Sequence, residues 1–449
     1  MSKPVFVISC PIDTYSGYGS RSRDVVKAII NTGKYDVKVL PQKWGETPWG
    51  YIDDHEEWSF LKSHLLQEPR LTSQPEIWMQ ITIPNEFQPV GKYNIGVTAG
   101  IESSICNPTW LEGLNRMNLN LVSSHHSKEV FEKSKAEKKD DRTGQIVQTW
   151  KLEKPVEVLF EGANLETYFQ TTEFGNEDLY NDILKGVKED FAYLFVGHWL
   201  SGNFGHDRKN VSLLIKSFLE VFKNKMNPPA LILKTAQGVA SKMDKDSLLK
   251  RINELKKSVN ATRLPNIYVL QGNLHDLDIN ELYNHPKVKA MISLTKGEGF
   301  GRPLLEFTLS GKPLIATNWS GHVDFLHPEG CALINGELEN VDPSAANDWL
   351  LKESKWFAPN HGEIGHYLKD VHKNYKTYKT KARKQLHHSK TNFSFEKMQD
   401  LLESILDKNI PEFPKEVKLQ LPKLKKVGQT QSEPELPKLK LPKLKKVNG

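Results

Sequence analysis

Short apolar runs alternate with longer amphipathic segments along the chain. The first apolar run is VFVIS at 5–9, and a glycine-bearing loop, CPIDTYSGYGS, follows it. The next segment, RSRDVVKAIINTG, spaces its apolar residues as one face of a helix does and ends at Gly33. A second apolar run, DVKVL, covers 36–40. Because a continuous apolar run is typical of a parallel strand buried on both faces, the opening predicts a strand, a helix and a parallel strand.

The same alternation continues and falls into two series. Further strands are predicted at 77–83, 93–100, 119–124 and 156–162 in the first series, and at 191–197, 230–235, 266–272, 288–295 and 312–318 in the second, which also contains a helix at 210–224. The stretch between 165 and 190 is polar, and we place the domain boundary there. Strands that alternate with helices indicate parallel sheets. We therefore expect an α/β protein with two Rossmann-like lobes, 1–185 and 190–385, whose central cleft binds a ligand beyond the carboxyl ends of the strands.

The composition is that of a globular protein. The chain has 449 residues, more than one hydrophobic core usually serves, and no apolar run reaches the length of a membrane span. The first residues lack the charged leader and the cleavage site of a signal peptide, so we interpret them as a strand. Three widely spaced cysteines argue against a disulfide framework and favour a reducing, cytoplasmic environment.

The C-terminal segment differs in composition from the rest. The sequence at 392–409 is spaced as an amphipathic helix that crosses back to the first lobe, and LPKLKKV follows twice, at 421–427 and 441–447. Residues 411–449 contain ten Lys and four Glu, so the net charge of this tail, +6, equals that of the whole chain. Proline at this density favours an extended or disordered tail. The tail is either a flexible, solubilising extension or a tether to an anionic surface, such as nucleic acid or an acidic membrane.

One segment of the second series surrounds a predicted helix start with two carboxylates and two glycines. It reads TKGEGFGRPLLEFTLSGKPLIATNWSGHVDFL and runs from 295 to 326. Pro303 suits the first turn of a helix at 302–310, and Gly311 suits its C-terminal cap. This arrangement predicts a strand that turns sharply into a helix at one edge of the sheet.

The residues of that turn point to a nucleotide sugar. Gly299 and Gly301, with Phe300 between them, let the backbone approach a ligand, and a helix start attracts anions such as a diphosphate. Glu298 and Glu306 repel a phosphate, but they accept hydrogen bonds from hydroxyl groups. We expect Glu298 to contact the transferred sugar and Glu306 the ribose. The alternative is an ordinary turn with incidental surface glutamates.

The same segment resembles the donor-site signature of the retaining glycosyltransferases of family 4, in the glycosyl transferases group 1. Seven residues separate the two glutamates, and the glycines, the strand GKPLIATN and SGHVDFL follow in the family's order. The resemblance implies a GT-B fold, a nucleoside-diphosphate sugar as co-substrate and an open–close motion of two lobes.

Two further segments match this family. LFVGHWLSGNFGHDRKNVSLLIKSF resembles its strand, loop and helix with a basic pair, which implies that Arg208 and Lys209 neutralise the leaving diphosphate. A solvated basic turn is the alternative. SGYGS resembles the glycine loop that faces the cleft, so Gly17 and Gly19 are candidates for contact with the donor or the acceptor. A plain strand-to-helix turn is the alternative there.

The end of the strand at 93–100 departs from the family. Many members have a cleft histidine at this position, whereas this chain has Ile101 and Glu102, and Glu102 becomes a candidate catalytic residue. His125 and His126 follow one strand later, where packing or surface positions are the expectation.

Two other features are weaker. Within the stretch QKWGETPWGYIDDHEEWSF, the fifteen residues 44–58 contain Trp44, Trp49, Tyr51 and Trp58, which either stack on an acceptor or simply pack. DLD at 276–278 imitates the metal motif of a different glycosyltransferase fold, but we expect it in a loop. We expect no metal and no other cofactor, because Arg208, Lys209 and the helix start supply the positive charge.

The sequence thus predicts a retaining hexosyl- or pentosyltransferase that moves a sugar from a nucleoside-diphosphate sugar to an acceptor hydroxyl. The acceptor stays open among a glycan, a lipid-linked molecule and a nucleic acid. Two alternatives remain. One is a DNA-associated transferase that glycosylates modified bases, and the other is a non-catalytic scaffold that binds sugar nucleotides or nucleic acid.

Overall fold

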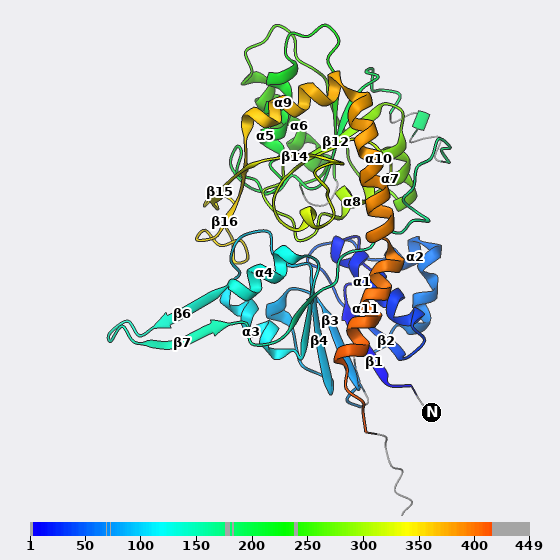
Figure 1. Cartoon of the computed structure of the whole chain (residues 1–449), viewed down its shortest axis with the longest axis vertical. Coiled ribbons are helices and arrows are strands. Elements are labelled where there is room, and N and C mark those ends of the chain that lie inside the picture. Colours follow the sequence, from blue (N-terminus) through cyan, green and yellow to red (C-terminus); the bar gives the residue numbers. More distant parts are fainter. Residues whose placement is uncertain are drawn as a thin grey trace, which may run out of the picture. The chain divides into compact units, whose positions relative to one another are not determined.

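The computed structural model describes residues 3–68, 70–71, 73–175, 180–181, 184–237 and 241–414. Two six-stranded sheets form its framework, and every neighbouring pair of strands in both sheets is parallel. Figure 1 shows the two lobes, with the N-terminal one below. The predicted α/β class with two Rossmann-like lobes is therefore confirmed. Most of the predicted tail, from 415 onward, lies outside the described residues.

The N-terminal lobe is built on a sheet with the strand order β2-β1-β3-β4-β5-β8. Its strands are β1 (Val5–Cys10), β2 (Asp36–Pro41), β3 (Ile77–Ile81), β4 (Tyr93–Thr98), β5 (Leu119–Val122) and β8 (Val156–Val158). Its helices are α1 (Gly17–Asn31), α2 (Tyr51–Asp54), α3 (Pro108–Arg116) and α4 (His125–Lys133), with 3-10 helices η1 (Glu56–His64) and η2 (Pro84–Glu86). All five residues of β3 are buried, as expected for a strand with both faces covered.

The C-terminal lobe repeats this plan with the strand order β11-β10-β9-β12-β13-β14. Its strands are β9 (Ala192–Val196), β10 (Ala230–Lys234), β11 (Ile267–Leu270), β12 (Val288–Ser293), β13 (Leu314–Thr317) and β14 (Ala332–Ile334). Its helices are α5 (Val211–Phe222), α6 (Lys242–Lys257), α7 (Asp276–Asn284), α8 (Arg302–Thr308), α9 (His361–Lys373) and α10 (Tyr375–Asn392), with the 3-10 helix η4 (Gly321–Asp324).

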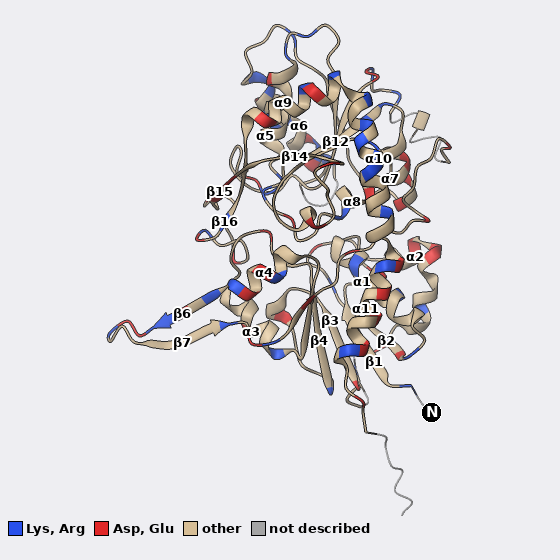
Figure 2. Ribbon diagram, in the orientation of Figure 1, with Lys and Arg blue, Asp and Glu red and all other residues tan. Residues whose placement is uncertain are grey.

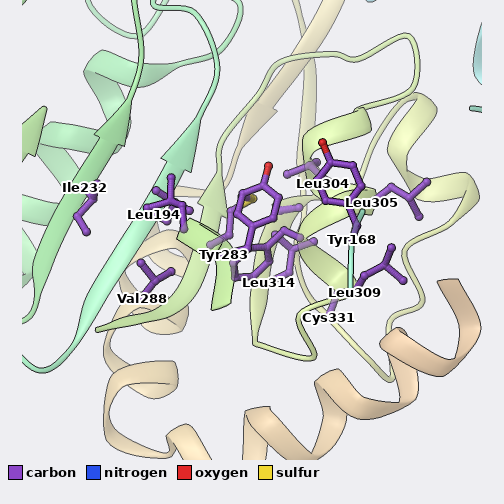
Figure 3. Close-up of a cluster of buried hydrophobic side chains, with 14 of the residues drawn as sticks. Tyr168, Leu194, Ile232, Tyr283, Val288, Leu304, Leu305, Leu309, Leu314 and Cys331 are labelled. Carbon is purple, nitrogen blue, oxygen red and sulfur yellow. The ribbon is translucent and has the colours of Figure 1, made fainter. Parts of the chain in front are cut away.

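Apolar side chains fill both faces of the C-terminal sheet. One of the two clusters, part of which is drawn in Figure 3, joins Leu194 and Val288 of the sheet to Leu304 and Leu305 of α8. Burial of such side chains is the main favourable contribution to folding. Because Leu304 and Leu305 anchor α8 in this core, the position of the loop before α8 is fixed relative to the sheet.

The final helix, α11 (Phe395–Asn409), lies against the N-terminal lobe, where it packs on α1. Lys34, just after α1, forms ion pairs with Glu403 and Asp407 of this helix. Figure 1 shows α10 and α11 running one after the other past both lobes. The chain thus returns to its first lobe, while the exact domain bounds proposed from the sequence stay a prediction.

Two antiparallel hairpins were not predicted from the sequence. One pairs β6 (Lys135–Lys139) with β7 (Ile146–Lys151), and the other pairs β15 (Gly336–Asn340) with β16 (Lys355–Pro359). The strands of the first hairpin are mostly exposed, and Figure 2 shows basic residues on β6. Such strands have no buried face, so they lack the alternation of apolar and polar residues that marks a strand in a sequence.

Two predicted elements differ from the structure by four residues at one end. The strand predicted at 156–162 ends at Val158, because the carbonyl groups of Leu159 and Phe160 leave the sheet and accept hydrogen bonds from Arg21. The predicted glycine loop is shorter than expected, because α1 already begins at Gly17. Within the described part of the chain, no helix is long and apolar enough to cross a membrane, and the three cysteines are free and buried.

Candidate functional site

The loop between β12 and α8 carries Glu298 and is held by backbone contacts on both sides. The N–H of Glu298 donates to Ser320 Oγ at 2.9 Å, and its carbonyl accepts from the N–H of Gly321 at 2.9 Å. A Cβ atom at Gly299 would lie only 2.3 Å from the carbonyl oxygen of Ala99, in the N-terminal lobe. Gly299 therefore permits the close approach of the two lobes at this point.

The start of α8 follows the sequence prediction. Gly301 is its N-cap in the left-handed region, at φ 94°, and Pro303 lies within the first turn. The helix ends at Thr308, two residues before the predicted end. Phe300 is 2% exposed, and its ring lies 4.9 Å from that of Phe325. The side chain of Phe300 therefore belongs to the hydrophobic core, and only its backbone remains for contact with a ligand.

The four predicted catalytic residues come together in one cluster. Lys209 Nζ lies 2.5 Å from Glu298 Oε1, and Arg208 Nη1 lies 3.6 Å from Glu298 Oε2. The same Arg208 atom lies 3.4 Å from Glu102 Oε1, so the cluster joins both lobes. Two cations thus face two carboxylates, and Glu298 is 8% exposed.

Charge determines the protonation of this cluster. Burial alone would raise the pKa of Glu298, but Lys209 and Arg208 outweigh burial and lower it to about 2. Burial would lower the pKa of Arg208, whereas the charges of Glu102 and Glu298 raise it above its usual value. Glu298 is therefore ionised at every physiological pH, and it holds the basic pair in place while no anion is bound.

The turn before α5 determines where the basic pair lies. Asp207 is fully buried, and its carboxylate accepts hydrogen bonds from Val211 N and from Ser212 Oγ, both at 2.9 Å. Asn210 has the left-handed φ of 56°. The carboxylate of Asp207 thus satisfies the free N–H groups of the helix start and leaves the next two residues, Arg208 and Lys209, in the interlobe cluster.

Glu306 belongs to a second buried cluster, centred on Arg302. Arg302 Nε donates to Glu306 Oε1 at 2.8 Å, and Arg302 Nη1 donates to Asp24 Oδ2 at 2.5 Å. Asp24 lies on α1, so this ion pair also joins the two lobes. Burial raises the pKa of Glu306 to about 8, with Asp276 and Asp24 adding to the effect and Arg302 opposing it. The single positive charge of Arg302 is shared by two carboxyl groups and does not offset the burial of Glu306. Glu306 is therefore protonated at neutral pH.

The DLD segment was assigned to a loop, and this assignment is wrong. Asp276 and Asp278 lie in the first turn of α7, where acidic side chains are favourable beside the partial positive charge of a helix start. Asp276 Oδ2 also lies 3.5 Å from Tyr51 Oη of the N-terminal lobe. Among the described residues, no three His, Cys, Asp or Glu side chains gather in a group that could hold a metal ion.

The two glycines of SGYGS have different surroundings. Gly17 has open space where a Cβ would stand, whereas a Cβ at Gly19 would lie 2.2 Å from the carbonyl oxygen of Thr14. Ser16 caps α1 by accepting a hydrogen bond from Gly19 N at 2.9 Å. Gly19 is therefore needed for packing within the lobe, and Gly17 is the glycine that leaves room for a ligand.

The histidines lie beside this site rather than in it. His125 is exposed, and its Nδ1 lies 3.1 Å from Asp324 Oδ2 of the opposite lobe. His126 packs against Trp319, and burial lowers its pKa to about 4. These surface and packing positions are the ones expected from the sequence. His322 is fully buried and donates from Nε2 to the carbonyl oxygen of Thr317 at 2.6 Å.

The aromatic stretch of the N-terminal lobe contributes mostly to packing. Trp44 stacks on Tyr18 with ring centroids 4.0 Å apart, and Arg23 lies 3.4 Å above the ring of Tyr51. Trp49 is 47% exposed. Of these residues, Trp49 has the largest surface available to an acceptor.

Sequence reasoning missed Arg302 and Asp24. Arg302 stands inside the quoted signature, beside Pro303, and Asp24 directly precedes the apolar residues Val25 and Val26 of the predicted first helix. An acidic residue beside positions that are predicted to be buried indicates an ion pair, because a buried charge needs a partner. The sequence does not say which partner, since 277 residues separate the two.

Comparisons with known proteins agree with this geometry. Residues 199–352 match the family model described as glycosyl transferases group 1. No curated protein matches the chain by sequence. The resemblance stated from the sequence thus agrees with the family model over residues 199–352, about a third of the chain.

Many solved structures share the fold. A glycosyltransferase from Rickettsia africae has a TM-score of 0.61 and 13% identity, and the alignment covers 92% of this chain and 100% of that one. HepE of Anabaena in complex with UDP-glucose has a TM-score of 0.55 and 12% identity, over 90% and 100% of the two chains. Sucrose-phosphate synthase from Thermosynechococcus elongatus has a TM-score of 0.57 and 12% identity, over 90% and 98%. At these identities the likeness establishes the fold alone.

Proposed function

Because residues 199–352 match the glycosyl transferases group 1 and the chain has the GT-B fold, we propose that this protein transfers a sugar from a nucleoside-diphosphate sugar to an acceptor hydroxyl, with retention at the anomeric carbon. The observation that carries this proposal is the interlobe cluster of Arg208, Lys209, Glu298 and Glu102. Two partly buried cations, with side chains 20% and 17% exposed, beside a glycine-bearing helix start favour the binding of a diphosphate.

The basic pair stabilises the charge that develops on the leaving diphosphate. Arg208 and Lys209 hold two positive charges in a partly buried environment, where an electrostatic contact is stronger than in water. An incoming diphosphate competes with Glu298 for Lys209. Glu298 is then free to accept hydrogen bonds from the hydroxyl groups of the transferred sugar.

Glu306 and Arg302 act at the other end of the donor. The neutral carboxyl group of Glu306 both donates and accepts hydrogen bonds, which matches the paired hydroxyls of a ribose. Arg302 fixes the orientation of this carboxyl group through the bond at 2.8 Å. The donor base and sugar are open, and we begin with UDP-sugars because HepE of Anabaena was solved with UDP-glucose.

Retention is part of the same proposal. In a front-face route, an oxygen of the leaving diphosphate takes the proton from the acceptor hydroxyl, so no enzymic nucleophile is needed. Glu102 orients the acceptor or the basic pair through its contact with Arg208 at 3.4 Å.

A panel of nucleotide sugars tests the proposal. Slow hydrolysis of one donor, with the products identified by mass, is expected for the wild-type protein. Replacing Lys209 by Met removes one charge-assisted contact, worth about 1.5–3 kcal/mol, and should lower kcat/KM for the donor at least tenfold. Lys223→Met is the matched control, because Lys223 pairs only with Glu220 on the surface of the same lobe among the ion pairs of the described residues. Equal donor use by the wild type and the Lys209 variant would contradict the site.

A further inference from the structure

A cavity of about 250 Å³ lies beside the basic pair, between the two lobes. Glu102 and Trp110 line it from the N-terminal lobe, and Arg208, Asn347 and Trp349 line it from the C-terminal lobe. This volume is below the range of about 300–1,000 Å³ that is usual for drug-sized ligands, and it suits one sugar ring better than a nucleotide. Pockets that orient a small molecule combine aromatic walls with a few polar groups, as this one does.

One wall of the cavity is the loop at 341–354, which joins β15 to β16. Val341 and Trp356 anchor its two ends in a small buried cluster. The loop is also tied to the opposite lobe, since Asn107 Nδ2 donates to the carbonyl oxygen of Asp348 at 2.9 Å. Ser104 is bonded to the start of β16 through both its N–H and its hydroxyl, at 2.9 Å and 2.8 Å. The cavity is therefore a built site with two fixed walls.

The aromatic residues come from opposite lobes and face each other. The rings of Trp110 and Trp349 have centroids 5.8 Å apart and are inclined at 31°. Trp110 is 4% exposed, and its indole Nε1 has no hydrogen-bond partner among the described residues. Trp349 is 38% exposed. Because the rings of Trp110 and Trp349 pack against each other and Trp110 is buried, the exposed part of Trp349 is the aromatic surface that a ligand can reach.

The polar residues of the cavity complete a carbohydrate site. The carboxylate of Glu102 accepts hydrogen bonds from hydroxyl groups, and the carboxamide oxygen of Asn347 already caps residues 349 and 350, so its amide nitrogen is the atom it offers a ligand. The C–H face of a pyranose packs well against an indole.

We propose that this cavity binds one pyranose ring of a glycan acceptor, packed against the exposed part of Trp349 with a hydroxyl on Glu102. This inference rests on the proposed function and adds to it the class of acceptor, a glycan. Arg208 connects the cavity to the donor site, because it lines the cavity and its Nη1 lies 3.6 Å from Glu298 Oε2. A hydroxyl bound at Glu102 therefore lies next to the group that stabilises the leaving diphosphate.

Replacement of Trp349 tests the inference with low risk to folding, since this side chain is partly exposed. Methyl pyranosides of glucose, galactose, mannose and N-acetylglucosamine serve as acceptor probes, and nucleotide release is measured with and without each. At least one probe should accelerate release by the wild type. Trp349→Ala should raise the KM for that probe about tenfold while hydrolysis without acceptor stays within twofold. Trp349→Phe should restore most of the effect, because it keeps an aromatic face.

Two comparisons sharpen the result. Leu338→Ala is the control, because Leu338 is exposed on β15 of the same hairpin but does not line the cavity. Trp49→Ala tests the rival aromatic surface of the N-terminal lobe. An unchanged KM in Trp349→Ala, or a raised KM in Trp49→Ala alone, would overturn the inference.

A binding measurement separates this inference from the proposed function. The protein is labelled with 5-fluorotryptophan, and its ¹⁹F spectrum is recorded while the same methyl pyranosides are added. The signal of residue 349, identified by its loss in Trp349→Phe, should shift with at least one probe. If it shifts but no donor is consumed, the site stands and the transferase proposal fails. If donor is consumed but no probe shifts the signal, the cavity is not the acceptor site.

Discussion

The ion pair between Arg302 and Asp24 makes a prediction about stability that follows directly from burial. The side chains of Arg302, Asp24 and Glu306 are 17%, 7% and 8% exposed, so water does little to solvate them. Replacing Arg302 by Met keeps the aliphatic stem and removes the only cation that contacts both carboxyl groups in the described structure. Breaking a buried pair by removing one partner costs about 3–5 kcal/mol, because the remaining charge has no compensation.

The assay is urea unfolding followed by both tryptophan fluorescence and far-ultraviolet circular dichroism. Coincidence of the two transitions is required before free energies are compared, since the chain has two lobes. Arg383→Met is the control, because Arg383 is exposed on α10, and we expect a change within about 0.5 kcal/mol there.

A second variant isolates the interaction itself. Asp24→Asn alone removes the interlobe charge, and the double variant Asp24→Asn with Arg302→Met completes a cycle. The double variant should lose less stability than the sum of the two single losses. Each single variant leaves the other member of the ion pair buried without a partner, whereas the double variant removes both members. Stability of Arg302→Met within about 1 kcal/mol of the wild type, with additive single losses, would refute the reasoning.

Three further predictions follow. Glu306 has a folded pKa of about 8, above its usual value, so the native state holds a proton that the unfolded chain releases, and stability should fall as pH rises from about 4.5 to 8. Melting temperatures over this range should show a smaller slope for Glu306→Gln, and equal slopes would contradict the shift. Donor hydrolysis in excess chelator should match that with added magnesium or manganese, because Arg208 and Lys209 supply the positive charge, and a strict metal requirement would disprove this. A chain truncated after Ile410 should hydrolyse donor at the full rate but lose transfer to an acceptor on an anionic surface at physiological salt, and equal transfer by both chains would show that the tail is no tether.

The sequence predicted the parallel sheets well, and the physical reason is burial. Strands such as β3 and β12 are covered on both faces, so they appear as continuous apolar runs. Both hairpins were missed, because β6, β7 and β15 are mostly exposed and β16 buries two consecutive residues, Trp356 and Phe357, instead of alternating ones. The missed hairpin β15–β16 matters, because the loop between its strands forms one wall of the proposed acceptor cavity.

The candidate site was predicted residue by residue but not as a set of contacts. Glu298 and Lys209 were each assigned from a motif, yet their contact at 2.5 Å spans 89 residues and depends on how two loops fold. The partner of Glu306 was missed entirely, because the charge balance around Arg302 involves a residue from the other lobe. Long-range ion pairs of this kind leave no periodic signal in a sequence.

The most direct test of the account follows the anomeric carbon. The wild-type protein is incubated with the nucleotide sugar that it consumes and with an acceptor pyranoside, and ¹H NMR spectra are recorded before the products equilibrate. We expect a new glycosidic signal with the same anomeric configuration as the donor, which disappears in Lys209→Met and persists in Lys223→Met. A product of inverted configuration would contradict retention, and the absence of any consumed donor across the panel would contradict the proposed transfer itself.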